Sequence, residues 1–139
     1  MAHTFFLEVV TPERSFYRGE CLSLMLPTVD GLYGVLAGHM PMVTAVDSGV
    51  LRYRTADGDW QFAAVGQGFA EIMPESAILL VATAERPGEI DEERARRAME
   101  RAEHRLHTAS ANPKEHAFSL EAVERAKARL AAKARQRDK

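Results

Sequence analysis

The chain has 139 residues, and 46% of them are hydrophobic, which is enough for one ordinary core or for a modest core with an appendage. Its 18 basic and 20 acidic residues leave a formal net charge of −2. Cys21 is the only cysteine, which excludes an intrachain disulfide and favours a reducing compartment. No apolar run approaches the roughly 18–20 residues that span a bilayer, and the first residues lack the features of a signal peptide. We therefore expect a soluble, intracellular protein, whose partners can still include a membrane-embedded one.

The composition of the chain changes near Gly88. Residues 1–88 contain all nine glycines, together with ten acidic and five basic residues. Residues 89–139 contain ten acidic and thirteen basic residues. The sequence therefore predicts a domain boundary at this point, with one domain over residues 1–88 and a second over residues 89–139.

The first domain consists of strand-sized segments separated by turn residues. Asp57-Gly58 is a hairpin turn signal, and Pro12, Pro27 and Pro74 each follow an apolar segment. Segments of this length at roughly 8–12-residue spacing, without helical periodicity, favour a small antiparallel sandwich or barrel of about eight to ten strands. The expected strands include residues 5–10, 21–26, 50–54, 60–65, 69–73 and 77–82.

The second domain has the periodicity of two helices. In the first, apolar side chains recur at helical spacing at Ala95, Met99, Ala102 and Leu106. A polar stretch over residues 108–113 interrupts the pattern, and Ser119 is predicted to cap the start of a second helix. The second apolar stripe is predicted at Leu120, Val123, Leu130 and Ala134. A short connection between two helices predicts an antiparallel hairpin.

The seam between these helices is made mostly of alanine. At roughly 0.8 kcal/mol per buried methylene, a seam of alanines gains little over the cost of ordering the helices. We therefore expect a hairpin that detaches, straightens or repacks easily.

Residues for catalysis or metal binding are sparse. His104 and His107 share a helix, but no carboxylate or cysteine completes a metal site, so solvated side chains are the favoured interpretation. The chain has no phosphate-binding loop and no nucleophile elbow. Cys21 lies in an apolar stretch without a nearby histidine, which favours a buried structural thiol. The sequence therefore predicts a non-catalytic protein without a metal or a permanent cofactor.

Residues 30–43 combine glycines and a proline with mostly apolar side chains. One interpretation is a loop that tucks Leu32, Val35 and Leu36 into its own sandwich. The other is a protein-docking surface, because exposed apolar side chains on rigid turns need a partner. The composition of the segment leaves both open.

A series of short motifs runs along the chain in a distinctive order. They are Val10-Thr11-Pro12, residues 31–44, Gly66-Gln67-Gly68-Phe69, Glu85-Arg86-Pro87, Ile90-Asp91-Glu92-Glu93-Arg94-Ala95, and two arginine-containing segments at residues 101–106 and 124–130. Together they resemble the epsilon subunit of bacterial F-type ATP synthases over almost the whole chain, including its Ile/Leu-Asp-x-x-Arg-Ala motif. One departure is Ala37, where proline is usual.

The resemblance implies a ten-stranded antiparallel β-sandwich followed by a two-helix antiparallel hairpin. It also implies a non-catalytic rotor subunit at the cytoplasmic face of the bacterial plasma membrane, associated with the membrane only through the complex. The implied partners are the gamma subunit, the c-ring and, through extended C-terminal helices that inhibit ATP hydrolysis, the alpha/beta hexamer. The implied contacts are Asp30, Gly31, Leu32 and Tyr33 for the c-ring, and His39 and Met42 for gamma.

A regulatory ATP site without magnesium is a further expectation. At 100° per helical residue, Asp91, Arg94 and Arg101 lie within about 80° of one another, while Arg125 and Arg129 are one turn apart. Folding of the hairpin can bring these guanidinium groups to one patch suited to a polyphosphate. Ordinary surface salt bridges, such as one between Asp91 and Arg94, are the alternative. The resemblance adds Glu85 and Ile90 to the set.

The main rival function is a stand-alone β-sandwich binding module whose basic helical tail binds nucleic acid. Glutamates at positions 100, 103, 121 and 124 interrupt the basic residues of that tail. A net charge of +3 over residues 89–139 attracts phosphates only weakly, so we expect no nucleic-acid partner.

Overall fold

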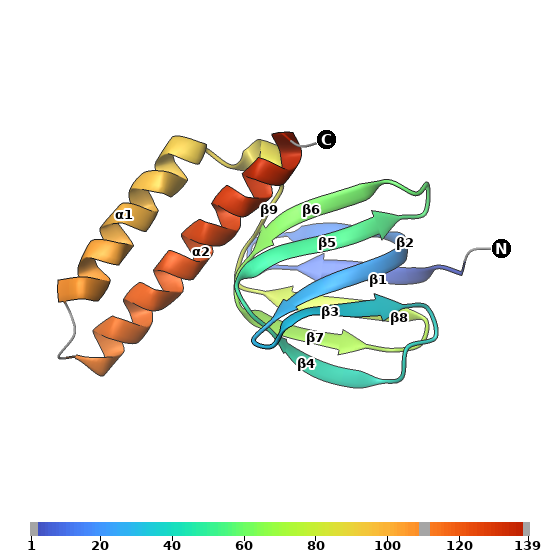
Figure 1. The fold of residues 1–139 in the computed structure, drawn as a ribbon. Helices are drawn as coiled ribbons and strands as arrows, with labels where there is room; N and C mark the ends of the chain where they lie inside the picture. Colours follow the sequence, from blue (N-terminus) through green and yellow to red (C-terminus); the bar gives the residue numbers. More distant parts are fainter. Residues whose placement is uncertain (1–2, 109–111, 138–139) are drawn as a thin grey trace.

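The computed structural model describes residues 3–108 and 112–137, which form a β-sandwich followed by two helices, α1 (Glu92–Thr108) and α2 (Pro113–Arg137) (Figure 1). The helices run antiparallel to each other on one flank of the sandwich, and α2 is the helix that packs on the strands. The predicted fold class is confirmed.

Nine strands form among the described residues, close to the ten that the resemblance implies. They are β1 (Phe5–Val10), β2 (Ser15–Thr28), β3 (Gly31–Leu36), β4 (Met42–Val46), β5 (Gly49–Thr55), β6 (Trp60–Val65), β7 (Gly68–Ile72), β8 (Ser76–Val81) and β9 (Ala84–Glu85).

The strands are hydrogen-bonded in the order β4-β7-β8-β1-β2-β5-β6-β9, with β3 paired to β2. The long strand β2 pairs with β1, β3 and β5, so it links the two layers of the sandwich and extends well beyond the predicted residues 21–26. Among the described strands, the one exception to antiparallel pairing is β1 with β8, where Leu7 lies opposite Ala77 in a parallel ladder. These two strands are far apart in the chain, so no hairpin imposes the antiparallel direction on them.

The core of the sandwich consists of aliphatic side chains that solvent does not reach. The largest of them are Leu7, Leu24, Leu26, Leu51, Ile72 and Leu79. Cys21 is also fully buried, and burial raises the pKa of its thiol above the usual value. The prediction of a buried structural thiol is confirmed.

The chain leaves the sandwich through a short 3₁₀ turn, η1 (Pro87–Glu89), that is tied to the strands. The Glu89 carboxylate accepts hydrogen bonds from the Arg86 backbone N–H at 2.9 Å and from Arg14 Nη2 at 3.1 Å. The bond from the Arg86 N–H is the main cause that lowers the pKa of Glu89. Arg86 Nη2 also donates to the Phe16 carbonyl at 2.8 Å. The predicted boundary at Gly88 falls inside this tethered turn, and it stays a prediction.

Helix α1 begins where the sequence indicates. The Asp91 side chain accepts a hydrogen bond from the Arg94 backbone N–H at 3.1 Å, and the Asp91 carbonyl accepts one from the Ala95 N–H at 3.0 Å. Asp91 therefore caps the helix, and Glu92 and Glu93 in the first turn favour the positive end of its dipole.

Helix α2 begins six residues before the predicted cap. Asn112 Oδ1 accepts hydrogen bonds from the backbone N–H groups of Lys114 at 3.0 Å and Glu115 at 3.4 Å, and Pro113 occupies the first helical position. Asparagine at the cap followed by proline is a favourable start, because proline loses no hydrogen bond there. The prediction that Ser119 caps the helix is wrong: Ser119 lies inside α2 and is 3% exposed.

The buried side chains of the two helices are small. They are Ala95, Ala102, Ser119, Val123, Ala126, Ala128 and Ala132, and three of these alanines join Ala64 of β6 and Ile90 in one cluster. The predicted alanine seam is confirmed. The placement of Leu120 and Ala134 in the stripe is wrong, because Leu120 is 45% exposed and Ala134 is exposed as well.

Candidate nucleotide site and docking surfaces

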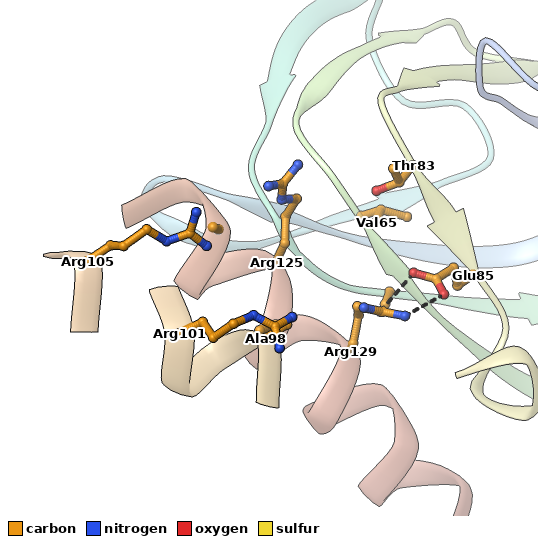
Figure 2. Close-up of a pocket in the computed structure, with 11 residues that line it drawn as sticks. Val65, Thr83, Glu85, Ala98, Arg101, Arg105, Arg125 and Arg129 are labelled. Carbon is orange, nitrogen blue, oxygen red and sulfur yellow. Dashed lines mark hydrogen bonds and ion pairs between the residues drawn. The ribbon is translucent and has the colours of Figure 1, made fainter. Parts of the chain in front are cut away.

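A cavity of about 290 Å³ lies between the two helices and the sandwich (Figure 2). The sandwich contributes Ala64 and Val65 of β6, Glu85 of β9, and Thr83 in the connection just before β9. The helices contribute Ala98, Arg101, Arg105, Ala122, Arg125, Ala126 and Arg129. The cavity exists only while the hairpin lies on the sandwich, because both parts of the chain supply its walls.

Four arginines line this cavity, two from each helix. Arg129 is paired with Glu85: its Nε lies 3.0 Å from Oε1, and its Nη2 donates to Oε2 at 3.3 Å (Figure 2). Within residues 3–108 and 112–137, no carboxylate forms an ion pair with Arg101, Arg105 or Arg125. Three guanidinium groups are thus available to an anionic ligand, and the alanine and valine side chains offer an apolar wall beside them.

The structure brings together four of the seven residues predicted for the nucleotide site. Glu85, Arg101, Arg125 and Arg129 line the cavity. The other three, Ile90, Asp91 and Arg94, lie elsewhere, as Ile90 packs under α2 and Asp91 caps α1.

The suggested ion pair between Asp91 and Arg94 takes a different form. Asp91 accepts its hydrogen bond from the backbone N–H of Arg94, not from the guanidinium group, which is exposed outside the cavity.

Two polar lining residues, Arg105 and Thr83, were missed by the sequence reasoning. Arg105 has a signal, because it follows Arg101 by four residues and therefore lies one helical turn further along the same face. Thr83 has none, since only the fold brings the end of the sandwich beside the helices.

The segment predicted to meet the c-ring forms the tip of the β2–β3 hairpin. Asp30 and Gly31 are exposed there, Leu32 is 46% exposed, and the preceding Val29 is 83% exposed. Tyr33 instead packs against the core, and its hydroxyl lies 2.7 Å from His39 Nε2. The apolar tip is therefore available for docking, whereas the Tyr33 side chain mostly contacts its own domain.

The two residues predicted to contact gamma are only half exposed. His39 is held by Tyr33, and its Nδ1 lies 2.8 Å from the Met40 carbonyl. Met42 packs against the core, and the Tyr33 hydroxyl donates to its sulfur at 3.2 Å. The neighbouring side chains of Met40 and Val43, at 71% and 68% exposed, present more apolar surface to solvent.

A larger apolar surface, the β4–β7–β8 face, extends outward from Val43. It consists of Val43 on β4, Phe69 on β7, and Ile78 and Leu80 on β8, which are 68%, 63%, 37% and 57% exposed. Phe69 lies opposite Leu80 in the β7–β8 ladder and opposite Ala45 in the β4–β7 ladder, so these side chains share one face of the sheet. The exposed Glu71 lies on the same face between Val43 and Ile78, and the remaining side chains form an apolar patch that indicates a protein-docking surface.

None of the described helices is long and apolar enough to cross a membrane. Over the same described part of the chain, no group of three or more His, Cys, Asp or Glu side chains could hold a metal ion.

Both halves of the chain match descriptions of known protein families. The family description "ATP synthase, Delta/Epsilon chain, beta-sandwich domain" matches residues 4–87, and "ATP synthase, Delta/Epsilon chain, long alpha-helix domain" matches residues 89–134. The chain is 48% identical to the ATP synthase epsilon chain of Ruminiclostridium cellulolyticum, covering 96% of this chain and 98% of that one. It is 43% identical to the epsilon chain of Syntrophomonas wolfei, over 93% of each.

The fold also has a counterpart among solved structures. A chain in the cryo-EM structure of the Euglena gracilis mitochondrial ATP synthase, described as OSCP/F1/c-ring in rotational state 1, matches with a TM-score of 0.80 and 22% identity, over 93% of this chain and 81% of that one. The sandwich, the two helices and the sequence matches across both agree, and the chain belongs to the ATP synthase delta/epsilon family.

Proposed function

We propose that this chain is a non-catalytic rotor subunit of a proton-translocating ATP synthase, which joins the gamma subunit to the c-ring and carries an ATP-sensitive brake in its helical hairpin. Its place in this proposal is the cytoplasmic face of the bacterial plasma membrane, where it is held through the complex. Membership of the delta/epsilon family supports the rotor role. The observation that carries the brake and the sensor is the arginine-lined cavity between hairpin and sandwich.

The cavity couples ligand binding to the position of the hairpin. Because strands and helices both line it, a ligand held there binds the docked arrangement and not a detached one. By mass action the ligand then favours the docked arrangement. The guanidinium groups supply the positive charge that a triphosphate needs, so ATP binds without magnesium in this proposal.

The brake follows from how lightly the hairpin is docked. Its buried side chains against the sandwich are mainly alanines, and its polar ties are the Glu85–Arg129 pair and a hydrogen bond from Lys133 Nζ to the Pro87 carbonyl at 3.0 Å. A partly exposed ion pair contributes only about 1 kcal/mol or less, so a partner can compete for the helices. In this proposal the released hairpin extends into the alpha/beta hexamer and obstructs rotation in the hydrolytic direction.

The docking surfaces complete the rotor role. We assign the c-ring contact to the β2–β3 tip with Asp30, Gly31 and Leu32, beside the inward-facing Tyr33. The gamma contact is assigned to the β4–β7–β8 face and to His39 and Met42 at its margin.

Deletion of residues 91–139 tests the brake. This cut keeps the Glu89 contacts that close the sandwich, and it removes both helices. ATP hydrolysis by the assembled enzyme should rise, because nothing remains to obstruct rotation, while ATP synthesis should stay near the wild-type rate. Hydrolysis that is unchanged in the deletion would show that the hairpin is not an inhibitor.

Substitution of Arg125 by alanine tests the nucleotide site. Loss of one charge-assisted contact of roughly 1.5 kcal/mol should weaken ATP binding to the isolated chain by about tenfold. Isothermal titration calorimetry in EDTA measures this directly. The same variant should require higher ATP concentrations to relieve inhibition in the assembled enzyme.

Arg97→Ala is the matched control for this substitution. Arg97 lies on the same hairpin outside the cavity, and its Nε donates only to the Glu93 carbonyl of its own helix, at 3.4 Å, among the described contacts. Lys133 is unsuitable as a control, because its bond to Pro87 helps to dock α2. Wild-type protein that binds no ATP at millimolar concentration would contradict the sensor and leave the brake to be judged by the deletion.

The rival nucleic-acid module gains no support from the arrangement of the tail. Its arginines at positions 101, 105, 125 and 129 line the cavity between the hairpin and the sandwich, so they do not form a stripe along one outer face of the tail.

A further inference from the structure

One carboxylate interrupts the apolar β4–β7–β8 face. Glu71 of β7 lies opposite Val43 in the β4–β7 ladder and opposite Ile78 in the β7–β8 ladder. Phe69 lies two residues before it on the same side of β7, and Met73 follows just beyond the end of the strand. Val43, Ile78, Phe69 and Met73 are 68%, 37%, 63% and 41% exposed. Glu71 is exposed as well, so its neighbours across and along the sheet surface are all apolar.

Glu71 forms no ion pair with any side chain of residues 3–108 and 112–137. Glu8 offers the contrast: it lies on the other side of Ile78 in the β1–β8 ladder, and its Oε2 is 3.3 Å from Arg18 Nε. Arg18 is three strands away from Glu71, roughly 14 Å at about 4.8 Å per strand, and it is already paired. The carboxylate of Glu8 is therefore satisfied within the sandwich, whereas that of Glu71 is left to a partner.

A partner that docks on the apolar side chains must cover Glu71 with them. Directly opposed side chains in a sheet are about 5 Å apart, and those two residues apart on one strand are about 7 Å apart. A surface that covers Phe69 and Val43 therefore also covers the carboxylate beside them. Removing a carboxylate from water against apolar atoms is strongly unfavourable unless a cation compensates for the lost hydration.

We propose that the gamma subunit presents a lysine or arginine side chain opposite Glu71, inside the apolar contact. This inference rests on the proposed docking of gamma on the β4–β7–β8 face, and it adds the charge that the gamma surface carries there. An ammonium or guanidinium group opposite Glu71 forms a charge-assisted hydrogen bond, which strengthens as water leaves the interface. The apolar neighbours supply contact area, and the ion pair fixes the register of the two subunits and rejects apolar or acidic surfaces.

Surface plasmon resonance of the full chain against purified gamma subunit tests this pair through the sign of the effect. Glu71→Gln keeps the shape of the side chain and removes its charge. It should weaken binding by about tenfold, because the cation of gamma is then buried without a counter-charge. Glu71→Leu should also weaken binding, although it enlarges the apolar patch. Without a cation on gamma, both substitutions would remove only the cost of burying a carboxylate, and binding would become tighter.

Charge reversal identifies the partner residue. Glu71→Lys should weaken binding more than Glu71→Gln does, because two like charges then face each other. The partner is sought in a panel of gamma variants, each with one lysine or arginine replaced by glutamate. One of them should restore binding to the Glu71→Lys chain and bind the wild-type chain poorly. A panel in which no variant restores binding contradicts a direct pair.

Glu75→Gln is the matched control. Glu75 is exposed in the turn between β7 and β8, has no ion pair among the described residues, and its substitution gives the same change in net charge. Gamma binding should stay within about twofold of wild type. Circular dichroism of the Glu71 variants should match the wild type, because Glu71 is exposed.

Unchanged or tighter binding of Glu71→Gln overturns the inference. A second substitution on the same face, Phe69→Asp, separates that failure from a failure of the proposed docking. If Phe69→Asp weakens binding and Glu71→Gln does not, gamma docks on this face without a cation opposite Glu71. If neither weakens binding, the β4–β7–β8 face is not the gamma surface, and both proposals are wrong.

Discussion

Replacing Gly68 with alanine is expected to destabilise the sandwich by about 3 kcal/mol, the largest effect among the substitutions considered for this chain. A Cβ atom at this position would lie 1.9 Å from the Leu80 carbonyl oxygen and 2.7 Å from the Val81 Cα. These are backbone atoms of β8, the strand hydrogen-bonded to β7, so no side chain can rotate away. The two strands must separate to admit one methyl group. The free energy of unfolding, from urea denaturation followed by circular dichroism, measures the effect.

Gly34→Ala is the matched control for this prediction. Its added Cβ would meet only the Met25 sulfur, at 3.4 Å, and that side chain is flexible. Its unfolding free energy should fall by about 1 kcal/mol or less. A Gly68→Ala protein as stable as the control would show that β7 and β8 are not packed as closely as the structure describes.

The second large effect is expected from Phe69→Asp. This side chain lies centrally on the β4–β7–β8 face and is 63% exposed, so a charge there should leave the sandwich folded. In a complex with gamma the same charge would be buried against apolar surface without a partner. We expect a loss of about 2 kcal/mol or more in binding free energy, which is roughly thirtyfold in the dissociation constant. Surface plasmon resonance against purified gamma subunit measures the change.

Phe118→Asp is the control for docking. Phe118 is an equally large side chain with a similar exposure of 59%, but it lies on α2 near the hairpin tip. Its substitution should leave gamma binding within about twofold of wild type, as for a surface change outside an interface. If both variants bind gamma like the wild type, the β4–β7–β8 face is not the gamma surface.

The β4–β7–β8 face is a surface that the sequence alone did not predict. The apolar run over residues 77–82 was predicted as a strand, and β8 (Ser76–Val81) confirms it. That run is apolar at successive positions, which indicates a strand covered on both faces. Its inner face packs in the core through Ala77 and Leu79, but only the sheet order shows that Leu80 lies beside Phe69 on the outer face.

The charged residues of the cavity show the same limit of prediction from sequence. Helical spacing was enough to place Arg101 on the face of α1 that meets the cavity, and Arg125 and Arg129 together on α2. It also selected Arg94, which lies outside, because angle around a helix says nothing about position along it. Arg94 is seven residues before Arg101, about 10 Å closer to the junction with the sandwich.

Local chemistry along the sequence by itself determined six of the nine described strands, the two helices, the buried thiol and the alanine-rich seam, because alternation, helical periodicity and side-chain size act between near neighbours in the chain. It did not indicate β3, β4 or β9. The start of α2 was within reach as well, since Asn112-Pro113 is a local signal that outweighs Ser119. Only the tertiary structure decided that β1 and β8 pair in parallel, that Phe69 and Leu80 share an exposed face, and that Glu85 and Thr83 lie opposite the arginines of the hairpin. Those contacts join residues far apart in the chain, and they depend on how complete elements pack, which no short window of sequence specifies.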